Sequence, residues 1–303
     1  MQLFAREDGL KKFRTLFGQP KNLTLTAFRT GTNIGQPKED WVQWLKKLPP
    51  LSDFRVVVSD NLPEILELRQ DAVLSGSFLW HIDIPAIDPS YKSYCEKLLI
   101  DHAPLHIAAD FFVSDELRQK TRIIPVGLIG TPQNEDPEWS VKKQSLLISG
   151  GRNKILANEL TNLVKELIQL DDRMGFREVW VDDELLPGEH PVWMKRADFD
   201  ETMFKSLSVA VIRPGVGTVT DCLRHRVFML AAAEEGNKEM QTNIQAITSS
   251  GNGREIKIED LSFRSICALL EKEKRNPENP PGIPVKFNGE KDFADFIETQ
   301  FGR

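Results

Sequence analysis

The sequence predicts an α/β protein with two doubly wound lobes, each built on a parallel sheet covered by helices on both faces. Three observations support this. The chain has 303 residues, more than one ordinary domain needs. Short, strongly apolar runs alternate with helical patterns, which is typical of buried parallel strands. A polar stretch with glycine and proline, residues 130–137, interrupts this alternation. We therefore expect domains at residues 1–130 and 131–303.

The composition indicates a soluble globular chain. It is 40% hydrophobic and 28% charged, with a net charge of -6 and a pI of about 5.6. The negative field disfavours nucleic acid as a partner. Three widely separated cysteines give neither a disulfide framework nor a metal-ligand spacing, which favours a reducing compartment. With no signal peptide and no run of ~18 apolar residues, we expect a cytoplasmic protein, with peripheral membrane contact left open.

The first lobe is predicted from alternation, buried apolar runs and proline stops. The expected elements are a strand at 22–28, a helix at 38–48, a fully buried strand at 55–60, a helical segment at 63–69, an apolar run at 77–80, a loop at 81–89, an amphipathic segment at 91–100, an apolar segment at 104–113 and a strand at 123–129.

The second lobe shows the same alternation more clearly. Short strands are expected at 145–149, 178–181, 209–212 and 227–230, and a helix at 153–170 with its leucines on one face. In such sheets, ligands bind beyond the carboxyl ends of the strands, where helix N-termini converge.

Two glycine turns follow strands of the second lobe and could hold a phosphate. They are Ser149-Gly150-Gly151 and the stretch from Gly215 through Gly217 to Thr218, which Arg213 precedes. A helix N-terminus offers unpaired N–H groups and roughly +0.5 of dipolar charge, and glycines let the backbone approach an anion. A lone Gly-x-Gly at the end of a strand is nevertheless more often only a turn, and that alternative stays open here.

Polar residues near the second glycine turn could bind sugars. Asp221 comes one turn into the helix, where a carboxylate can accept hydrogen bonds from a ribose diol. The simpler alternative is an acid of the first turn that the helix dipole stabilises. After the strand at 227–230, Glu239, Gln241 and Asn243 open another helix at the same edge of the sheet. These polar side chains could bind the hydroxyl groups of a sugar. The simpler alternative is that they form the solvated start of a helix.

Together these residues resemble the C-terminal domain of GT-B glycosyltransferases, in particular UDP-glycosyltransferases and the N-acetylglucosamine transferase of lipid II synthesis. The shared pattern is a basic residue, Gly, Ser or Thr, and an acid, followed about eighteen residues later by an acid-Gln-x-x-Asn group. The matching residues are Arg213, Gly215, Thr218, Asp221, Glu239 and Asn243. The resemblance extends over about residues 145–253 and, more loosely, residues 55–130. It implies two Rossmann-like domains facing a cleft.

The resemblance implies roles for these positions. Arg213 or the amides of residues 215–218 would meet the diphosphate of a nucleotide sugar, and Ser149 to Gly151 would be a second glycine loop facing the phosphates. Asp221 would bind the ribose, and Glu239 the hydroxyls of the donor sugar. The strand at 55–60 would end near the acceptor.

The sequence departs from the family at several positions. Met240 stands where the family often has Gln, and Arg226 and Phe228 replace a common Gly and Pro. The usual N-terminal Gly-His loop is missing, since no histidine precedes His81. Asp60 and His81 are therefore the candidates for a general base, although Asp60 could be a helix cap and His81 a packed histidine.

We expect a hexosyl- or N-acetylhexosaminyl-transferase that moves a sugar from a nucleoside diphosphate sugar, with uridine as the favoured base, to an acceptor hydroxyl not identified by the sequence. Three alternatives remain: a silent nucleotide-sugar-binding protein, one subunit of a two-chain transferase, or a nucleotide-sugar hydrolase or epimerase. No cofactor or metal is expected. Asp171-Asp172 and Asp182-Asp183 are interpreted as solvated surface acids rather than metal ligands.

Overall fold

The computed structural model describes most of the chain. The described residues are 1–5, 7, 10–11, 13–14, 18, 20–27, 37–83, 87–130, 145–151, 154–170, 175–274 and 285–302. Contacts divide the chain into two units, one of Met1–Ile107 with Asp115–Ile124 and one of Ala108–Ser114 with Pro125–Arg303. The predicted boundary at residue 130 stays a prediction, and the expected linker lies outside the described residues beyond Gly130.

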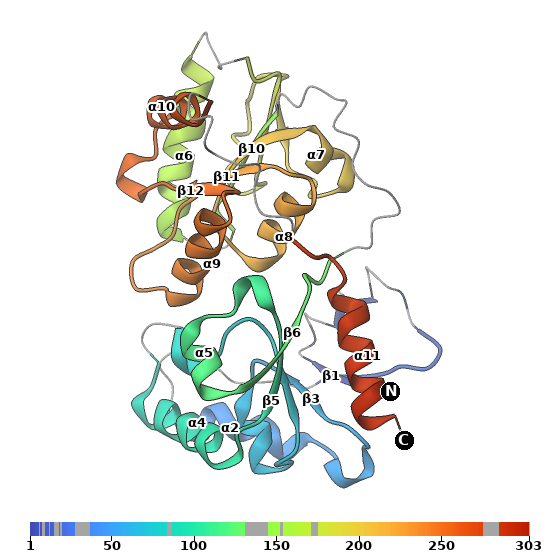
Figure 1. The fold of residues 1–303 in the computed structure, drawn as a ribbon. Coiled ribbons are helices and arrows are strands. Elements are labelled where there is room, and N and C mark those ends of the chain that lie inside the picture. Colours follow the sequence, from blue (N-terminus) through green and yellow to red (C-terminus); the bar gives the residue numbers. More distant parts are fainter. Residues whose placement is uncertain are drawn as a thin grey trace. The chain divides into compact units, whose positions relative to one another are not determined.

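The first unit contains a four-stranded sheet in the order β3-β4-β5-β6, and β1 pairs with β2 in a separate parallel pair (Figure 1). The strands are β1 (Gln2–Ala5), β2 (Thr24–Ala27), β3 (Val58–Asp60), β4 (Val73–Ser75), β5 (Leu105–Ala109) and β6 (Arg122–Val126). Strand β3 pairs in parallel with β4, and β4 with β5. The sequence analysis missed β1 and β4.

Helical segments connect these strands. They are α2 (Lys38–Val42), η1 (Gln43–Lys47), η2 (Leu51–Asp53), η3 (Pro63–Glu67), α3 (Trp80–Asp83), α4 (Pro89–His102), η4 (Asp110–Phe112) and α5 (Asp115–Lys120). Helix α4 begins where the Asp88 carboxylate accepts hydrogen bonds from the amides of Ser90 and Tyr91. It ends at Ala103, which has a left-handed backbone.

Two predictions for the first unit need correction. The strand expected at 55–60 is shorter and is not fully buried, because β3 lies at the edge of its sheet and Val58 is 40% exposed. The helix expected at 38–48 tightens into a 3₁₀ turn after Val42, although Trp41, Trp44 and Leu45 are buried as one apolar face requires.

A buried polar cluster joins η3 to α4 in this unit. The carboxylate of Glu64 is inaccessible to solvent and accepts hydrogen bonds from Trp44 Nε1 at 3.0 Å and from the Tyr91 hydroxyl at 3.2 Å. Tyr91 in turn stacks on Trp41 with ring centroids 4.4 Å apart. Burial raises the pKa of Glu64 from 4.5 to about 7, although its hydrogen bonds lower it in part.

The second unit contains a six-stranded sheet in the order β12-β11-β10-β7-β8-β9, parallel at every pairing. Its strands are β7 (Ser145–Ser149), β8 (Glu178–Val181), β9 (Met194–Arg196), β10 (Leu207–Ile212), β11 (Phe228–Ala231) and β12 (Gly253–Glu255). The predicted strands at 145–149 and 178–181 are confirmed to the residue. Strands β9 and β12 were not predicted because they are short and carry charged residues.

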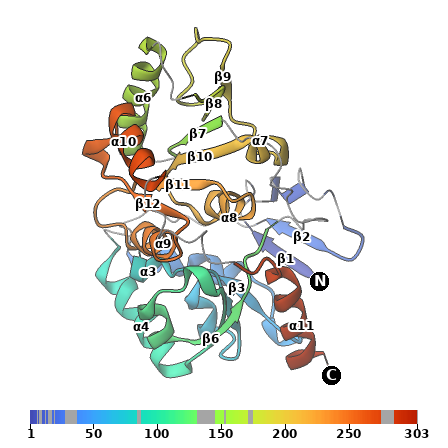
Figure 2. The same cartoon turned by 45° about the horizontal axis from the view of Figure 1, so that its top comes forward.

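Helices cover both faces of this sheet. They are α6 (Lys154–Gln169), α7 (Glu201–Ser206), α8 (Val216–Arg224), α9 (Lys238–Ser249) and α10 (Phe263–Lys274). The 3₁₀ turn η5 (Ile258–Asp260) precedes α10, and α11 (Gly289–Phe301) is the last helix of the described residues. Alternate residues of β7 and β10 enter two cores, so that Ile148 and Val211 pack with α6 and α10, while Leu147 and Ala210 pack with α7, α8 and α9. Figures 1 and 2 show α6 beside α10, apart from α8 and α9.

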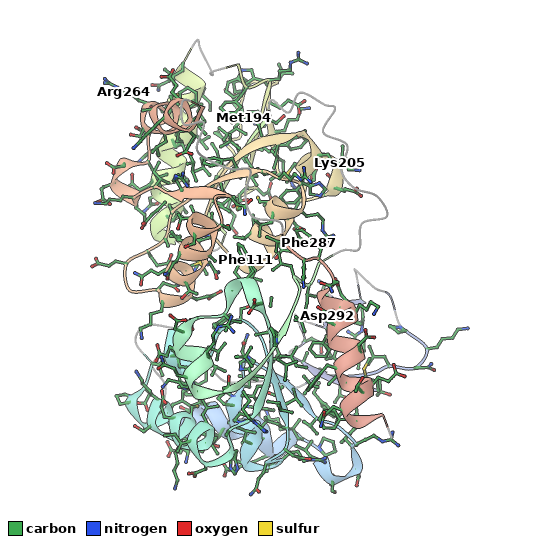
Figure 3. All side chains as sticks on the ribbon, in the orientation of Figure 1. Phe111, Met194, Lys205, Arg264, Phe287 and Asp292 are labelled. Atoms are coloured by element: carbon green, nitrogen blue, oxygen red, sulfur yellow. The ribbon has the colours of Figure 1, made fainter. Side chains whose placement is uncertain are left out.

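The segment that follows β6, Gly127 and Leu128, is tied to the start of α11. Leu128 donates its amide hydrogen to the Lys286 carbonyl at 2.8 Å, and Gly289 donates to Leu128 at 3.1 Å. The carboxylate of Asp292, on the first turn of α11 (Figure 3), accepts from the Gly127 amide at 3.0 Å. These bonds hold two distant parts of the sequence together.

We predict a pH-dependent stability from Glu64. Because its folded pKa is raised, the neutral carboxyl is favoured in the fold, and this contribution is complete below about pH 4.5 and lost as pH rises through about 7. Over that interval the free energy of unfolding should fall by up to about 3 kcal/mol more in the wild type than in Glu64→Gln. Urea unfolding across this range measures the difference.

The matched control is Glu67→Gln, because Glu67 also accepts a hydrogen bond from a tyrosine, Tyr94, but is exposed. It should follow the wild-type pH profile. Parallel profiles for wild type and Glu64→Gln would contradict the prediction.

Candidate functional site

Both predicted glycine turns lie at the carboxyl edge of the second sheet, on neighbouring strands. Strands β7 and β10 pair in parallel with Ser149 opposite Ile212, and the Arg213 amide donates to the Ser149 carbonyl at 2.9 Å. A Cβ built on Gly151 would lie 4.0 Å from Cδ of Arg213. The structure therefore brings the two turns together, as the parallel pattern predicts.

The first turn is held by a carboxylate from the neighbouring strand. Oδ2 of Asp182, directly after β8, accepts from Ser149 Oγ at 3.1 Å, from the Gly150 amide at 2.9 Å and from the Gly151 amide at 3.2 Å. Burial raises the pKa of Asp182, against the lowering effect of these bonds. The prediction that Asp182 is a solvated surface acid is wrong; Asp183 beside it is exposed.

The glycines of the two turns have different surroundings. A Cβ on Gly150 would approach Leu160 Cδ1 to 3.0 Å, and Gly151 has a left-handed φ of 57°, so the first turn needs glycine for packing and backbone shape. Within the described part of the chain, a Cβ on Gly215 or Gly217 would meet no atom within 4 Å other than its chain neighbours and its own helix backbone. The second turn is thus open to an approaching group.

Helix α8 begins at this open turn, with Gly215 as its N-cap. The amides of its first turn have no intrahelical acceptor, and Gly215 has no side chain to occupy them. Thr218 is half-buried and Gly217 is exposed. Asp221 is half-buried, and burial raises its pKa, although the charge of Arg224 offsets part of this effect. An anion at these amides would therefore have a carboxylate one turn away.

Arg213 does not stand free at the site. Its Nη2 and Nε donate to the Glu234 carboxylate at 2.8 and 3.2 Å, and Asn237 Nδ2 donates to the same carboxylate at 2.7 Å. Burial would raise the pKa of Glu234, but the hydrogen bonds from Arg213 and Asn237 and the charge of Arg213 outweigh it and hold the pKa below its usual range. The positive charge of Arg213, which was predicted to bind phosphate, is therefore neutralised by Glu234.

The predicted sugar-binding residues of α9 have three different surroundings. Asn243 is buried and donates from Nδ2 to the Pro214 carbonyl at 2.8 Å, so it holds the turn before α8 in place. Gln241 is exposed and Glu239 is half-buried. Met240 stands where the related enzymes often have Gln. Its side chain is buried, so this position does not form part of the exposed surface of α9.

The two candidate bases differ in accessibility. Asp60 ends β3 with an exposed side chain, and partial desolvation raises its pKa. His81 lies in the short helix α3, not in the expected loop, and is 1% exposed. Burial and the charges of Lys120 and Lys92 lower its pKa to about 3, so it is neutral at pH 7. These surroundings fit the packed histidine that the sequence left as the alternative.

His106, to which the sequence assigned no role, lies on β5 opposite Leu74 of β4. Its Nε2 is 2.9 Å from the Gly76 carbonyl, and burial lowers its pKa to about 4. At neutral pH Nε2 therefore donates to that carbonyl. It supports the Gly76 turn at the same sheet edge as Asp60.

The second unit also has a cavity of about 540 Å³ away from the glycine turns. Phe111, Lys286 and Asp292 contribute to its lining, together with the C-terminal end of α9; Phe111 and Asp292 are labelled in Figure 3. Among the described residues, no three His, Cys, Asp or Glu side chains are grouped to hold a metal ion. In the same residues no helix is long and apolar enough to cross a membrane.

Comparison with known proteins identifies the fold. No protein-family model and no curated protein sequence matches the chain. Solved structures do match. A glycosyltransferase of kitacinnamycin has a TM-score of 0.63 at 13% identity, over 99% of this chain and 91% of that one. The fold is that of the GT-B glycosyltransferases.

Two further matches agree with this assignment. The calicheamicin glycosyltransferase CalG4 has a TM-score of 0.60 at 14% identity, over 100% of this chain and 90% of that one. Arabidopsis thaliana UGT89C1, in a structure with UDP, has a TM-score of 0.60 at 13% identity, over 98% and 91%. The expected two Rossmann-like domains of a GT-B protein are confirmed.

Sequence reasoning missed three residues that shape the site, Asp182, Glu234 and Asn237. Asp182 directly follows a predicted strand, which places it at the carboxyl edge like the glycine turns. Glu234 and Asn237 belong to the polar loop before α9. Only the tertiary structure shows that Glu234 binds Arg213, and that Asn237 donates to Glu234 and caps α9.

We predict that Asn243 stabilises the turn before α8. Asn243→Ala removes the donor to the buried Pro214 carbonyl and should lower the free energy of unfolding by about 1–3 kcal/mol. Urea unfolding measures this. Gln241→Ala, on the exposed face of the same helix, should change it by less than about 0.5 kcal/mol. Equal effects of the two substitutions would refute the structural role.

Proposed function

We propose that the chain is a glycosyltransferase that takes a sugar from a nucleoside diphosphate sugar, with uridine as the favoured base. The observation that carries the proposal is the open N-terminus of α8, with Asp221 one turn into the helix, in a protein of GT-B fold. Matching solved structures include complexes with UDP, with UDP-L-rhamnose and with thymidine diphosphate.

The diphosphate binds at the first turn of α8. Free amides and the helix dipole attract an anion there, and the exposed Gly217 lets it approach the backbone. The Thr218 hydroxyl adds a donor, and Asp221 accepts hydrogen bonds from the ribose hydroxyls. Glu239, half-buried at the start of α9, is the acceptor for hydroxyls of the donor sugar.

In the transfer, Asp60 is the candidate base that takes the proton from the acceptor hydroxyl, since a raised pKa brings a carboxylate closer to the range useful for proton transfer. The oxygen then forms a bond to the sugar, the bond from sugar to diphosphate breaks, and the amides of α8 stabilise the departing diphosphate.

A second candidate is a nucleotide-sugar-binding protein without catalysis. The specific observation in its favour is that His81 is buried and neutral with a pKa of about 3, which leaves Asp60 alone among the predicted bases. Under either function we place the protein in the cytoplasm, with a nucleotide sugar as ligand, no nucleic acid partner, and peripheral membrane contact as an open property.

Nucleotide binding should depend on Asp221. UDP should raise the Tm of the wild type, and Asp221→Ala should weaken UDP binding about tenfold because charge-assisted hydrogen bonds to the ribose are lost. Isothermal titration and a thermal-shift panel of nucleotides measure both effects. Asp260→Asn, an exposed acid distant in sequence, is the control. If no nucleoside diphosphate binds the wild type, the proposed function fails.

The effect of substitution on kcat should distinguish the two candidate bases, Asp60 and His81. Asp60→Asn should lower kcat for sugar transfer by about 10²–10⁴-fold while the affinity for UDP stays unchanged. His81→Gln should retain kcat, because the neutral imidazole is buried. Release of UDP from UDP-sugars, with and without a panel of acceptor alcohols, provides the measurement. Lack of turnover together with donor binding would instead favour the silent binding protein.

A further inference from the structure

The Ser149–Gly151 turn already binds an anion from its own chain. A hydroxyl and two backbone amides converge on one oxygen, Oδ2 of Asp182, at 2.9–3.2 Å. Consecutive amides ending in a left-handed glycine form the concave arrangement that binds phosphate oxygens in many proteins. Here the carboxylate oxygen takes the place that a phosphate oxygen would need.

The charges around this turn also disfavour a second anion. Glu184 adds negative potential at Asp182 and helps to raise its pKa. The nearest cation in the second turn, Arg213, is paired with Glu234, and both are largely shielded, at 24% and 13% side-chain exposure. The guanidinium therefore offers little uncompensated positive charge to a ligand at the first turn.

Among the described residues, nothing comparable fills the second turn. A Cβ at Gly215 or Gly217 would have no described atom within 4 Å apart from its chain neighbours and its own helix backbone, and Asp221 lies a full helical turn further along α8. The two glycine turns thus sit side by side with opposite properties, one occupied by a carboxylate and one open.

We propose that Asp182 is a specificity-determining residue that excludes phosphate from the Ser149–Gly151 turn, so that the donor diphosphate binds to the first turn of α8 alone. This rests on the proposed function and corrects the role that the family resemblance implies for Ser149, Gly150 and Gly151. Asp182 occupies the donors of the first turn and repels the diphosphate beside it.

The first test is the effect of the Asp182 charge on affinity. Asp182→Asn keeps an oxygen that can accept from the turn but removes the charge, and it should tighten UDP binding about tenfold. Binding of uridine, which carries no phosphate, should not change. Asp183→Asn removes the neighbouring exposed charge, near Arg196 at 3.7 Å, and is the matched control with little effect on either ligand. Isothermal titration measures all affinities.

The outcomes are separable. Weaker or unchanged UDP binding by a folded Asp182→Asn, with UDP binding to the wild type intact, overturns the role of Asp182 but leaves the proposed function standing. Tighter UDP binding by Asp182→Asn than by the wild type, with uridine binding unchanged, supports the exclusion. Absence of nucleotide binding by wild type and all variants overturns both.

A second test uses the wild-type protein and does not depend on how a variant folds. In amide NMR spectra recorded during a UDP titration, Gly217 and Thr218 should shift, whereas Gly150 and Gly151 should keep their positions because Asp182 retains their hydrogen bonds. Shifts of Gly150 and Gly151 as large as those of Gly217 would show phosphate at the first turn and would overturn the proposal.

Discussion

The parallel pairing of β7 with β10 is the constraint on which the site depends. Residues 146–149 of β7 lie opposite residues 209–212 of β10, so both strands end at one level of the sheet and their following turns meet. All five residues of β7 are buried, which fixes this register through two packed cores. A slip by one residue would exchange the two faces and separate Ser149 from Arg213.

The electrostatics of this edge differ from those of a simple phosphate pocket. Its arginine is bound by Glu234, its first turn is bound by Asp182, and what remains is the dipole of α8 with open amides. Attraction of an anion by fixed dipoles requires close approach and correct orientation, whereas a free guanidinium attracts anions over a longer range. Such a site selects its ligand by geometry more than by charge, in keeping with the net charge of -6.

Buried polar groups position elements in both units. Asn243 fixes the turn before α8 from α9, and Glu64 joins Trp44 to Tyr91 in the first unit. Each of these contacts is costly to break, because a buried donor or acceptor without a partner loses its hydration and gains nothing in return. These side chains act on the site or the fold by holding other groups in position.

The sequence by itself determined the α/β class, the strands at 145–149 and 178–181, the helix after Gly215 and the convergence of the glycine turns, because apolar periodicity and turn residues are local properties. The GT-B fold that the resemblance implied is confirmed. Only the tertiary structure decided that Asp182 binds the first turn and Glu234 binds Arg213. It also decided that Asn243 donates to the Pro214 carbonyl and that His81 is buried. These contacts depend on which side chains from distant parts of the chain lie next to each other in the fold. The local pattern of a single sequence does not specify the distances between such side chains.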